Sequence, residues 1–426
     1  MSDLKTNAAA AKKASRILAT LTSDQKNAAL LKIAEVLKEN AEKIFAENKI
    51  DLENATKAEL PLPILKRLKF DEAKLEDCIA GINSLINLED PVNKVKLHTT
   101  LDDGLELYRV TCPIGVIGLI FESRPDAVIQ IATLCLKSGN AVFLKGGSEA
   151  ERSNKILSSL IYEAGVKAGL PEGWLFLLTS RADVNEMLSL NNYIDLIIPR
   201  GSNAFVQYIM KNTTIAVLGH ADGVCHSYID SEADIEKAIK VVFDAKTQYV
   251  ATCNTTETVL INRAVKDQVL GRLIEKLKEK NVEFFADDEI SSEYGFTKVT
   301  DWHTEYLDYK VSLKLVNDID EAIEHINTYG SGHTDAIITE NKEKAEKFML
   351  SVDSGCVFVN CSTRFSDGFR FGFGAEVGVS TSKLHARGPV GLEGLISYKY
   401  KLIGDGATVN EFASHERTFK HVYHKV

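Results

Sequence analysis

The feature that most constrains the fold is an alternation of short apolar runs with helical segments, which begins near residue 112. Continuous apolar runs of four to eight residues predict strands that are buried on both faces. Strands that alternate with helices need crossover connections, so they predict a parallel sheet. The sequence therefore indicates an α/β fold. Its first strands are expected at 114–121, 141–144, 175–178, 194–198, 214–218 and 227–230.

The alternation starts again after Cys253, which predicts a second α/β unit. Its strands are expected at 258–261, 282–285, 309–316, 335–338 and 355–360. Residues 5–90 are predicted to be mostly helical, and Thr22-Ser-Asp-Gln25 matches a capping box at a helix start. The domain division expected from this pattern is 1–90 with 111–247, then 248–394, then 91–110 with 395–426.

Residues 91–110 differ from the helices before them. Apolar residues alternate on both sides of Asp103-Gly104, which predicts a β-hairpin. The segments 395–404 and 408–412 are expected to be strands that pair with it. Two interpretations stay open: a protruding ribbon that pairs with another subunit, or an ordinary edge hairpin.

Cys253 is the candidate nucleophile. It lies among small polar residues, directly before the apolar run 258–261. A thiol on a loop that feeds a buried strand is held firmly and can still face a cleft, as a reactive thiolate must. The alternative is an inert buried thiol, because cysteine is among the most buried residue types.

Two turns are candidates for phosphate binding. Lys145-Gly-Gly-Ser148 and Arg200-Gly-Ser-Asn203 each follow a buried strand and precede a helix. Exposed backbone amides at a helix start suit an anion, and ligands of parallel sheets bind beyond the carboxyl ends of the strands. Each turn alone could be an ordinary connection. Together, with one Lys and one Arg, they indicate a dinucleotide.

Composition narrows the remaining choices. The net charge is −10 with no basic cluster, so no nucleic-acid partner is expected. No apolar run approaches the ~18 residues of a membrane span, and no signal peptide is recognisable. The seven cysteines are scattered without a Cys-x-x-Cys pair, which favours a reducing, cytoplasmic location and argues against a metal site. The glycine-rich segment 362–394 carries Arg364 and Arg370, which could line an anion pocket.

Several motifs resemble the aldehyde dehydrogenase superfamily. Pro113-Ile-Gly-Val-Ile-Gly-Leu-Ile120, Lys145-Gly-Gly-Ser-Glu149, Gly169-Leu-Pro-Glu-Gly173 and the Cys253 strand occur in that family's order. Within it, residues 316–337 resemble the signature of the γ-glutamyl phosphate reductase family. Residues 121–126, 301–306 and 384–389 also fit.

This resemblance implies two Rossmann-like domains, one for the cofactor and one for catalysis, and a small β element for oligomerisation into a homodimer or homotetramer. It implies NADPH-dependent reduction of L-glutamyl 5-phosphate, a small-molecule substrate, to L-glutamate 5-semialdehyde in proline biosynthesis. Cys253 would form a thioester, and its backbone amide and Asn254 would bind the oxyanion.

The resemblance also suggests the other site residues. Lys145, Gly147 and Ser148 would meet the adenosine ribose or its phosphate, Gly201 and Ser202 the pyrophosphate, and Glu305 the nicotinamide ribose. His333, Arg364 and Arg370 are expected to bind the substrate phosphate or carboxylates, and the alternative for each is a structural hydrogen bond.

Two departures from hydrolytic aldehyde dehydrogenases concern the acyl intermediate. Ser123 stands where those enzymes have a catalytic Asn, and His220 where they have a Glu general base. Without that Glu, hydrolysis of the thioester is disfavoured. The alternatives that remain are an oxidising aldehyde dehydrogenase of the same fold and, from another class, a non-catalytic binding protein.

Overall fold

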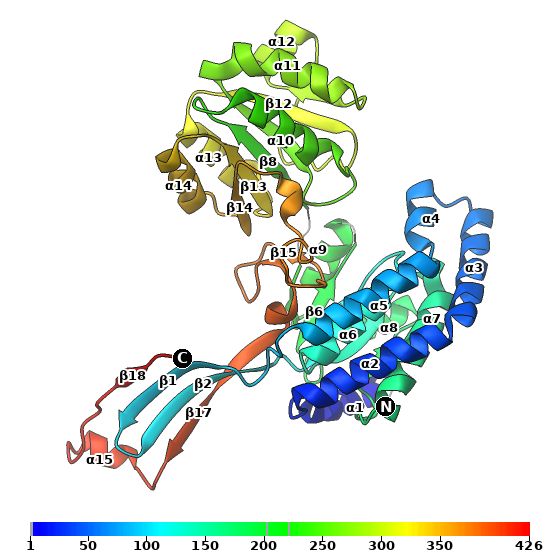
Figure 1. The fold of residues 1–426 in the computed structure, drawn as a ribbon, viewed down its shortest axis with the longest axis vertical. Helices are drawn as coiled ribbons and strands as arrows, with labels where there is room; N and C mark the ends of the chain where they lie inside the picture. Colours follow the sequence, from blue (N-terminus) through cyan, green and yellow to red (C-terminus); the bar gives the residue numbers. More distant parts are fainter. Residues whose placement is uncertain (1–2, 202, 220–221) are drawn as a thin grey trace.

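The computed structural model describes residues 3–201, 203–219 and 222–426, without the side chains of residues 63 and 203. It has two α/β lobes and a β ribbon that extends away from both (Figure 1). The glycine-rich segment around β15 lies where the two lobes and the ribbon meet (Figure 1).

The first lobe is a parallel sheet with strand order β5-β4-β3-β6-β7. The chain starts at the central strand β3, builds outward to β5, and then crosses to β6, so the strand order reverses between β3 and β6. Such a reversal leaves a crevice at the carboxyl ends of the strands. The strands are β3 (Val116–Ile120), β4 (Ala141–Lys145), β5 (Leu175–Leu177), β6 (Leu196–Pro199) and β7 (Ala216–Val217).

Helices cover this sheet, and five of them come from the N-terminal segment. Thr22 and Gln25 form the predicted capping box at the start of α2. The helices are α1 (Asp3–Leu18), α2 (Ser23–Glu39), α3 (Ala41–Lys57), α4 (Leu62–Leu68), α5 (Glu72–Asn87), α6 (Pro125–Lys137), α7 (Glu151–Lys167), α8 (Arg181–Met187) and α9 (Asn203–Lys211), with the 3-10 turn η1 (Ser148–Ala150).

The second lobe is a seven-stranded parallel sheet with strand order β11-β10-β12-β9-β8-β13-β14. Neighbouring residues of one strand enter different cores: Ile229 packs with α10 and α11, and Tyr228 packs with α13 and α14. The strands are β8 (Cys225–Ile229), β9 (Thr256–Asn262), β10 (Glu283–Ala286), β11 (Thr297–Lys298), β12 (Lys310–Val316), β13 (Thr334–Ile338) and β14 (Cys356–Val359).

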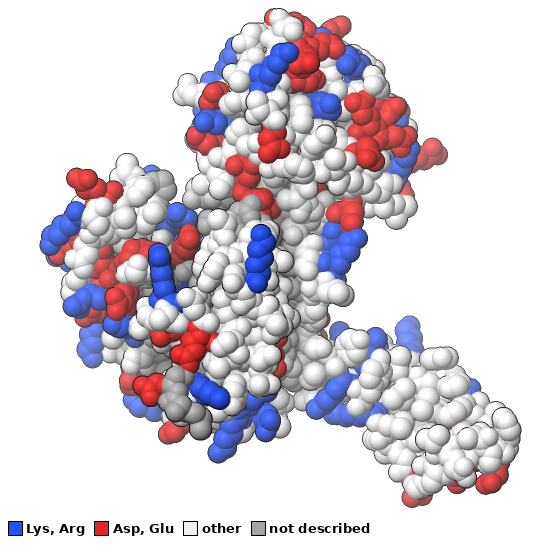
Figure 2. Space-filling view, turned by 180° about the vertical axis from the view of Figure 1, so that it is seen from behind, with Lys and Arg blue, Asp and Glu red and all other residues white. Residues whose placement is uncertain are grey.

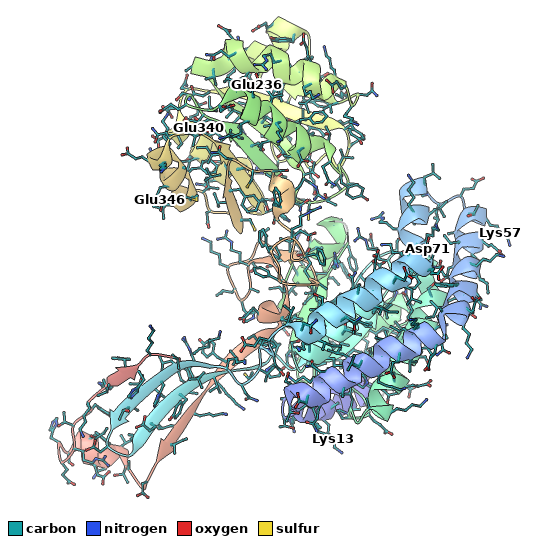
Figure 3. All side chains as sticks on the ribbon, in the orientation of Figure 1. Lys13, Lys57, Asp71, Glu236, Glu340 and Glu346 are labelled. Carbon is teal, nitrogen blue, oxygen red and sulfur yellow. The ribbon has the colours of Figure 1, made fainter. Side chains whose placement is uncertain are left out.

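The helices of this lobe are α10 (Ile235–Thr247), α11 (Lys266–Lys278), α12 (Asp288–Tyr294), α13 (Ile319–Tyr329) and α14 (Lys342–Ser351), with the 3-10 turn η2 (Arg263–Val265). Labelled charged side chains such as Glu236, Glu340 and Glu346 lie on its outer surface (Figure 3). The buried apolar residues of this lobe form two core clusters, and strands of the sheet contribute to both.

The strand expected at 227–230 was assigned to the wrong sheet. It is β8, which lies between β9 and β13 in the second lobe, and α10 packs there too. The change of lobe therefore comes before Cys225 and not at residue 247. A buried apolar run shows that a strand has two covered faces, but it does not show which sheet receives it.

The ribbon is an antiparallel sheet with strand order β17-β2-β1-β18, and it contains the predicted hairpin. Its strands are β1 (Val95–Asp102), β2 (Leu105–Pro113), β17 (Ile396–Gly404) and β18 (Val422–His424). The strand predicted at 408–412 is wrong, because this segment forms the helix α15 (Val409–Ala413) with a capping box from Thr408 to Glu411. Segment 362–394 is mostly loop, with η3 (Thr363–Phe365), β15 (Val379–Ser380), β16 (Gly388–Pro389) and η4 (Leu392–Leu395).

Candidate active site

Cys253 lies at the amino edge of the second sheet. It precedes β9 by three residues, while Cys225 begins the adjacent β8 and His333 directly precedes the next strand, β13. Because these strands are parallel neighbours, residues far apart in the sequence meet at one edge. Cys253 is half-buried, whereas Cys225 and His333 are fully buried.

The sulfur of Cys253 contacts an imidazole. Nε2 of His333 lies 3.2 Å from Sγ of Cys253, and Nδ1 of the same ring lies 2.8 Å from Oγ1 of Thr334. His333 was expected to bind substrate. The structure places it against the sulfur with 0% of its surface exposed, where it touches the nucleophile, and its expected contact with substrate stays a prediction.

The backbone of Cys253 is supported from below. The thiol of Cys225 donates to the carbonyl oxygen of Cys253 at 3.1 Å, and burial raises the pKa of Cys225 well above its usual value, so that it keeps this proton. Gly223 lies against the same peptide: a Cβ there would be 1.9 Å from the Cys253 oxygen. Only glycine allows this approach.

Asn254 joins the nucleophile loop to the glycine-rich segment. Its Nδ2 donates to the carbonyl oxygen of Ser366 at 2.8 Å, and its Oδ1 accepts from Oγ1 of Thr252 at 3.1 Å. The side chain is buried. Its expected role as an oxyanion donor stays a prediction, and one amide hydrogen remains for that role beside the one given to Ser366.

A buried ion pair brackets the nucleophile loop. Nζ of Lys246, at the end of α10, lies 2.6 Å from Oε2 of Glu257 on β9, and both side chains are fully buried. Burial raises the pKa of Glu257 to about 7 and lowers that of Lys246, while their mutual attraction opposes both shifts. Oε1 of Glu257 also accepts from the backbone N–H of Leu307 at 3.3 Å.

Two guanidinium groups lie within electrostatic range of the nucleophile. Arg200 and Arg364 both interact electrostatically with Cys253, and burial lowers the pKa of each without removing its charge. Nε of Arg364 donates to Oε1 of Gln248 at 3.0 Å. Arg370 is more exposed, and its Nη1 donates to the backbone oxygen of Arg364, so it supports Arg364.

A cleft of about 820 Å³ crosses the carboxyl ends of β3, β4, β5 and β6 in the first lobe. It is the crevice expected where the strand order reverses. Ser123, Lys145, Gly147, Ser148 and Arg200 are among its lining residues, so three of the six predicted cofactor residues share one cavity with Arg200, which interacts electrostatically with Cys253.

The predicted residues outside this lining are placed as follows. Gly201 follows Arg200 directly and is exposed. Glu305 lies half-buried in the second lobe, close enough to Glu257 to raise its pKa. Ser202 and His220, both named from the sequence, lie outside the described residues.

Ser123 points to a carboxylate in this cleft. Its backbone N–H and its hydroxyl both donate to Oε1 of Glu149, at 2.7 and 2.5 Å, and its φ of +35° bends the chain toward that group. Burial works to raise the pKa of Glu149, but the hydrogen bonds from Ser123, one from the backbone of Glu149 and the charge of Lys145 together lower it. Gly147 makes room for the carboxylate, because a Cβ there would lie 2.0 Å from Oε1.

Comparisons with known proteins agree with this architecture. The pattern of the aldehyde dehydrogenase family matches residues 1–292 and 311–398. The gamma-glutamyl phosphate reductase of Acetivibrio thermocellus is 61% identical over 412 residues, covering 96% of each chain. That of Ruminiclostridium cellulolyticum is 60% identical, covering 95% of this chain and 94% of its own.

A solved structure supports the same assignment. The crystal structure of the gamma-glutamyl phosphate reductase of Thermotoga maritima superposes with a TM-score of 0.93 at 38% identity, covering 96% of this chain and all of that one. Among the described residues, no helix has the length and apolar character needed to cross a bilayer.

Proposed function

The chain belongs to the aldehyde dehydrogenase family, and from this premise we propose that it reduces L-glutamyl 5-phosphate to L-glutamate 5-semialdehyde and phosphate with NADPH. This is the second step of proline biosynthesis from glutamate. The observation that carries the proposal is the position of Cys253, whose sulfur lies beside His333 and interacts electrostatically with the guanidinium groups of Arg200 and Arg364.

Cys253 carries the covalent step of the proposed reaction. Its sulfur attacks the acyl carbon, a C–S bond forms, and the bond from that carbon to the phosphate oxygen breaks. The resulting thioester accepts a hydride more readily than a carboxylate, because its carbonyl is less stabilised by resonance. The nicotinamide, when bound, supplies that hydride.

The arginines suit the charges of this substrate. An acyl phosphate with a free α-carboxylate carries negative charge at both ends, and a guanidinium binds phosphate and carboxylate in a forked geometry. Arg200 and Arg364 are assigned to these charges, and Arg370 supports Arg364 through its backbone oxygen.

The residues of the first-lobe cleft fit a dinucleotide. The turn after β4 has two successive glycines, Gly146 and Gly147, and ends in Ser148, and Lys145 contributes a cation to the same lining. The cleft volume of about 820 Å³ lies in the usual range for cofactor sites. Lys145, Gly147 and Ser148 would hold the adenosine side, Gly201 and Ser202 the pyrophosphate, and Glu305 the nicotinamide ribose. The charge of Lys145 suits the extra phosphate of NADPH.

The ribbon is assigned to self-association into a homodimer or homotetramer. The face of the ribbon seen in Figure 2 carries few charged side chains, and β17 exposes Tyr398, Tyr400, Leu402 and Ile403, each by more than half of its surface. Exposed apolar patches of this kind mark contact sites. The seven cysteines are free thiols in the structure, which accords with the cytoplasmic location that the proposal assumes.

The reverse reaction tests the proposed function. Wild type is expected to reduce NADP⁺ with glutamate 5-semialdehyde only when phosphate is present, more efficiently than NAD⁺. Cys253→Ala should abolish this turnover, while Cys361→Ala, which removes another half-buried thiol, should keep it. Oxidation of the aldehyde without phosphate would instead identify an oxidising aldehyde dehydrogenase.

A further inference from the structure

We propose that His333 is the base that deprotonates Cys253, so that the reactive form of the site is a thiolate–imidazolium pair. The inference rests on the proposed function for its substrate, but the ionisation itself can be tested without any substrate. His333 is a catalytic residue in this proposal because its ring touches the reacting sulfur.

The contact has the geometry of a nucleophile with its base. Nε2 of His333 lies 3.2 Å from Sγ of Cys253, within reach of a thiol proton. The ring is fully buried and follows Gly332, whose φ of +70° suits a turn directly before β13. The position of the ring is therefore fixed by its place directly before β13 and by its burial.

The other ring nitrogen sets the tautomer. Nδ1 lies 2.8 Å from Oγ1 of Thr334 and 3.8 Å from Sγ of Cys225, whose proton goes to the Cys253 carbonyl oxygen, and the Thr334 hydroxyl also hydrogen-bonds Cys356. When that hydroxyl gives its only proton to Cys356, its oxygen accepts the Nδ1–H of His333. Nε2 then carries the lone pair that faces the Cys253 thiol.

Among the residues that the structure describes, the other groups that act on the sulfur offer no second base. Cys225, Arg200 and Arg364 interact electrostatically with Cys253. Arginine keeps its proton, and the thiol of Cys225 already donates to the Cys253 carbonyl oxygen. Glu257 lies further back, paired with Lys246. The arginines stabilise the thiolate that His333 generates.

The proton balance of the reaction follows from burial. The S–H bond breaks and an N–H bond forms on Nε2. The thiolate then forms the C–S bond, and phosphate leaves with the electron pair of the broken C–O bond. Once the sulfur is acylated, the buried imidazolium has lost its counter-charge and releases its proton. The departing phosphate takes up one proton, so the two transfers balance. When the aldehyde leaves, the regenerated thiolate is paired again as His333 takes a proton from solvent.

The test is the pH dependence of Cys253 alkylation by iodoacetamide, measured at the Cys253 peptide without substrate or cofactor. A free cysteine ionises near pH 8.5, at about its usual pKa. Wild type is expected to show a midpoint below that value, and His333→Gln a midpoint at least about one pH unit higher than wild type. The midpoint is the proper readout, because a thiolate of lower pKa is also less nucleophilic and the two effects partly cancel in the rate at neutral pH.

Two further variants make the result decisive. Thr334→Val keeps the imidazole but removes the oxygen beside Nδ1, and it should shift the midpoint in the same direction by less. His325→Gln replaces another buried histidine of this lobe, whose ring packs beside His226 and Trp302, and it should leave the midpoint unchanged.

An equal midpoint in wild type and His333→Gln would overturn the proposal, and so would a wild-type midpoint at or above about 8.5. The second criterion needs no variant, so it holds if His333→Gln does not fold. A wild type that shows the low midpoint but no phosphate-dependent turnover would contradict the proposed function and leave the role of His333 standing.

Discussion

Glu257→Gln should destabilise the second lobe strongly, because it leaves the buried ammonium of Lys246 without a counter-charge. The two charged atoms lie 2.6 Å apart and both side chains have 0% exposure, so water cannot replace the lost partner. Breaking a buried ion pair by removing one partner typically costs about 3–5 kcal/mol. We expect a loss in that range in the free energy of unfolding.

The matched control is Glu151→Gln. Glu151 pairs with Lys155 at the same distance of 2.6 Å, but both side chains are about half exposed. Exposed pairs of this kind contribute about 0–1 kcal/mol. The difference between the two variants in the loss of unfolding free energy therefore reports the effect of burial on ion pairs of equal length.

Urea unfolding followed by tryptophan fluorescence can measure both variants, since Trp302 lies in the second lobe and Trp174 is buried in the first. A loss below about 1 kcal/mol in the free energy of unfolding of Glu257→Gln would refute the reasoning, because a buried ammonium without a counter-charge should destabilise the fold by more than that.

A double replacement separates stability from function. Lys246→Met with Glu257→Leu removes both charges and keeps similar volumes, a change that is often neutral for stability. Activity should still fall, because the N–H of Leu307 then loses its carboxylate acceptor in the loop that carries Glu305. Full activity in a stable double variant would show that the pair does not position this loop.

Two further predictions concern the nucleophile loop and the ribbon. Gly223→Ala should displace Cys253 and lower kcat by about 100-fold or more, because the new Cβ would lie 1.9 Å from the Cys253 oxygen. The control Gly271→Ala should leave kcat unchanged, because its Cβ would meet nothing closer than 3.8 Å. Equal values of kcat in the two variants would contradict the packing argument. Asp102 has its pKa lowered to about 2, first by the backbone N–H of Asp103 and then by Arg417 and Lys420. Because the pKa of Asp102 is lowered in the folded state, its carboxylate stabilises the fold fully above pH 3.8, the ordinary pKa. This stabilisation is lost as the pH falls from 3.8 toward 2, so segment 417–424 should become protease-sensitive between these two pH values. Pepsin digestion of wild type and Asp102→Asn measures this, and the variant should be equally sensitive on both sides of the window.

The sequence by itself determined the local elements and the chemistry of single segments. The apolar runs 114–121 and 258–261 contain buried strands, at 116–120 and within 256–262, because their residues have no polar face to offer water. The turn at Asp103-Gly104 and the cap at Thr22 follow from hydrogen bonds and backbone freedom within four residues. The motifs around Cys253 and Lys145 also sufficed to indicate the family.

Only the tertiary structure decided which of these elements meet. His333 reaches Cys253 across 80 positions because β9, β8 and β13 lie side by side with their amino ends together, and strand order is set by packing between lobes and helices, which no local pattern contains. The same cause placed β8 in the second sheet and brought His333 to the sulfur of Cys253. Burial likewise decides how much Lys246 and Glu257 contribute to stability. In the sequence they are ordinary charged residues, and their pairing becomes essential only because the folded core excludes the water that would otherwise solvate both charges.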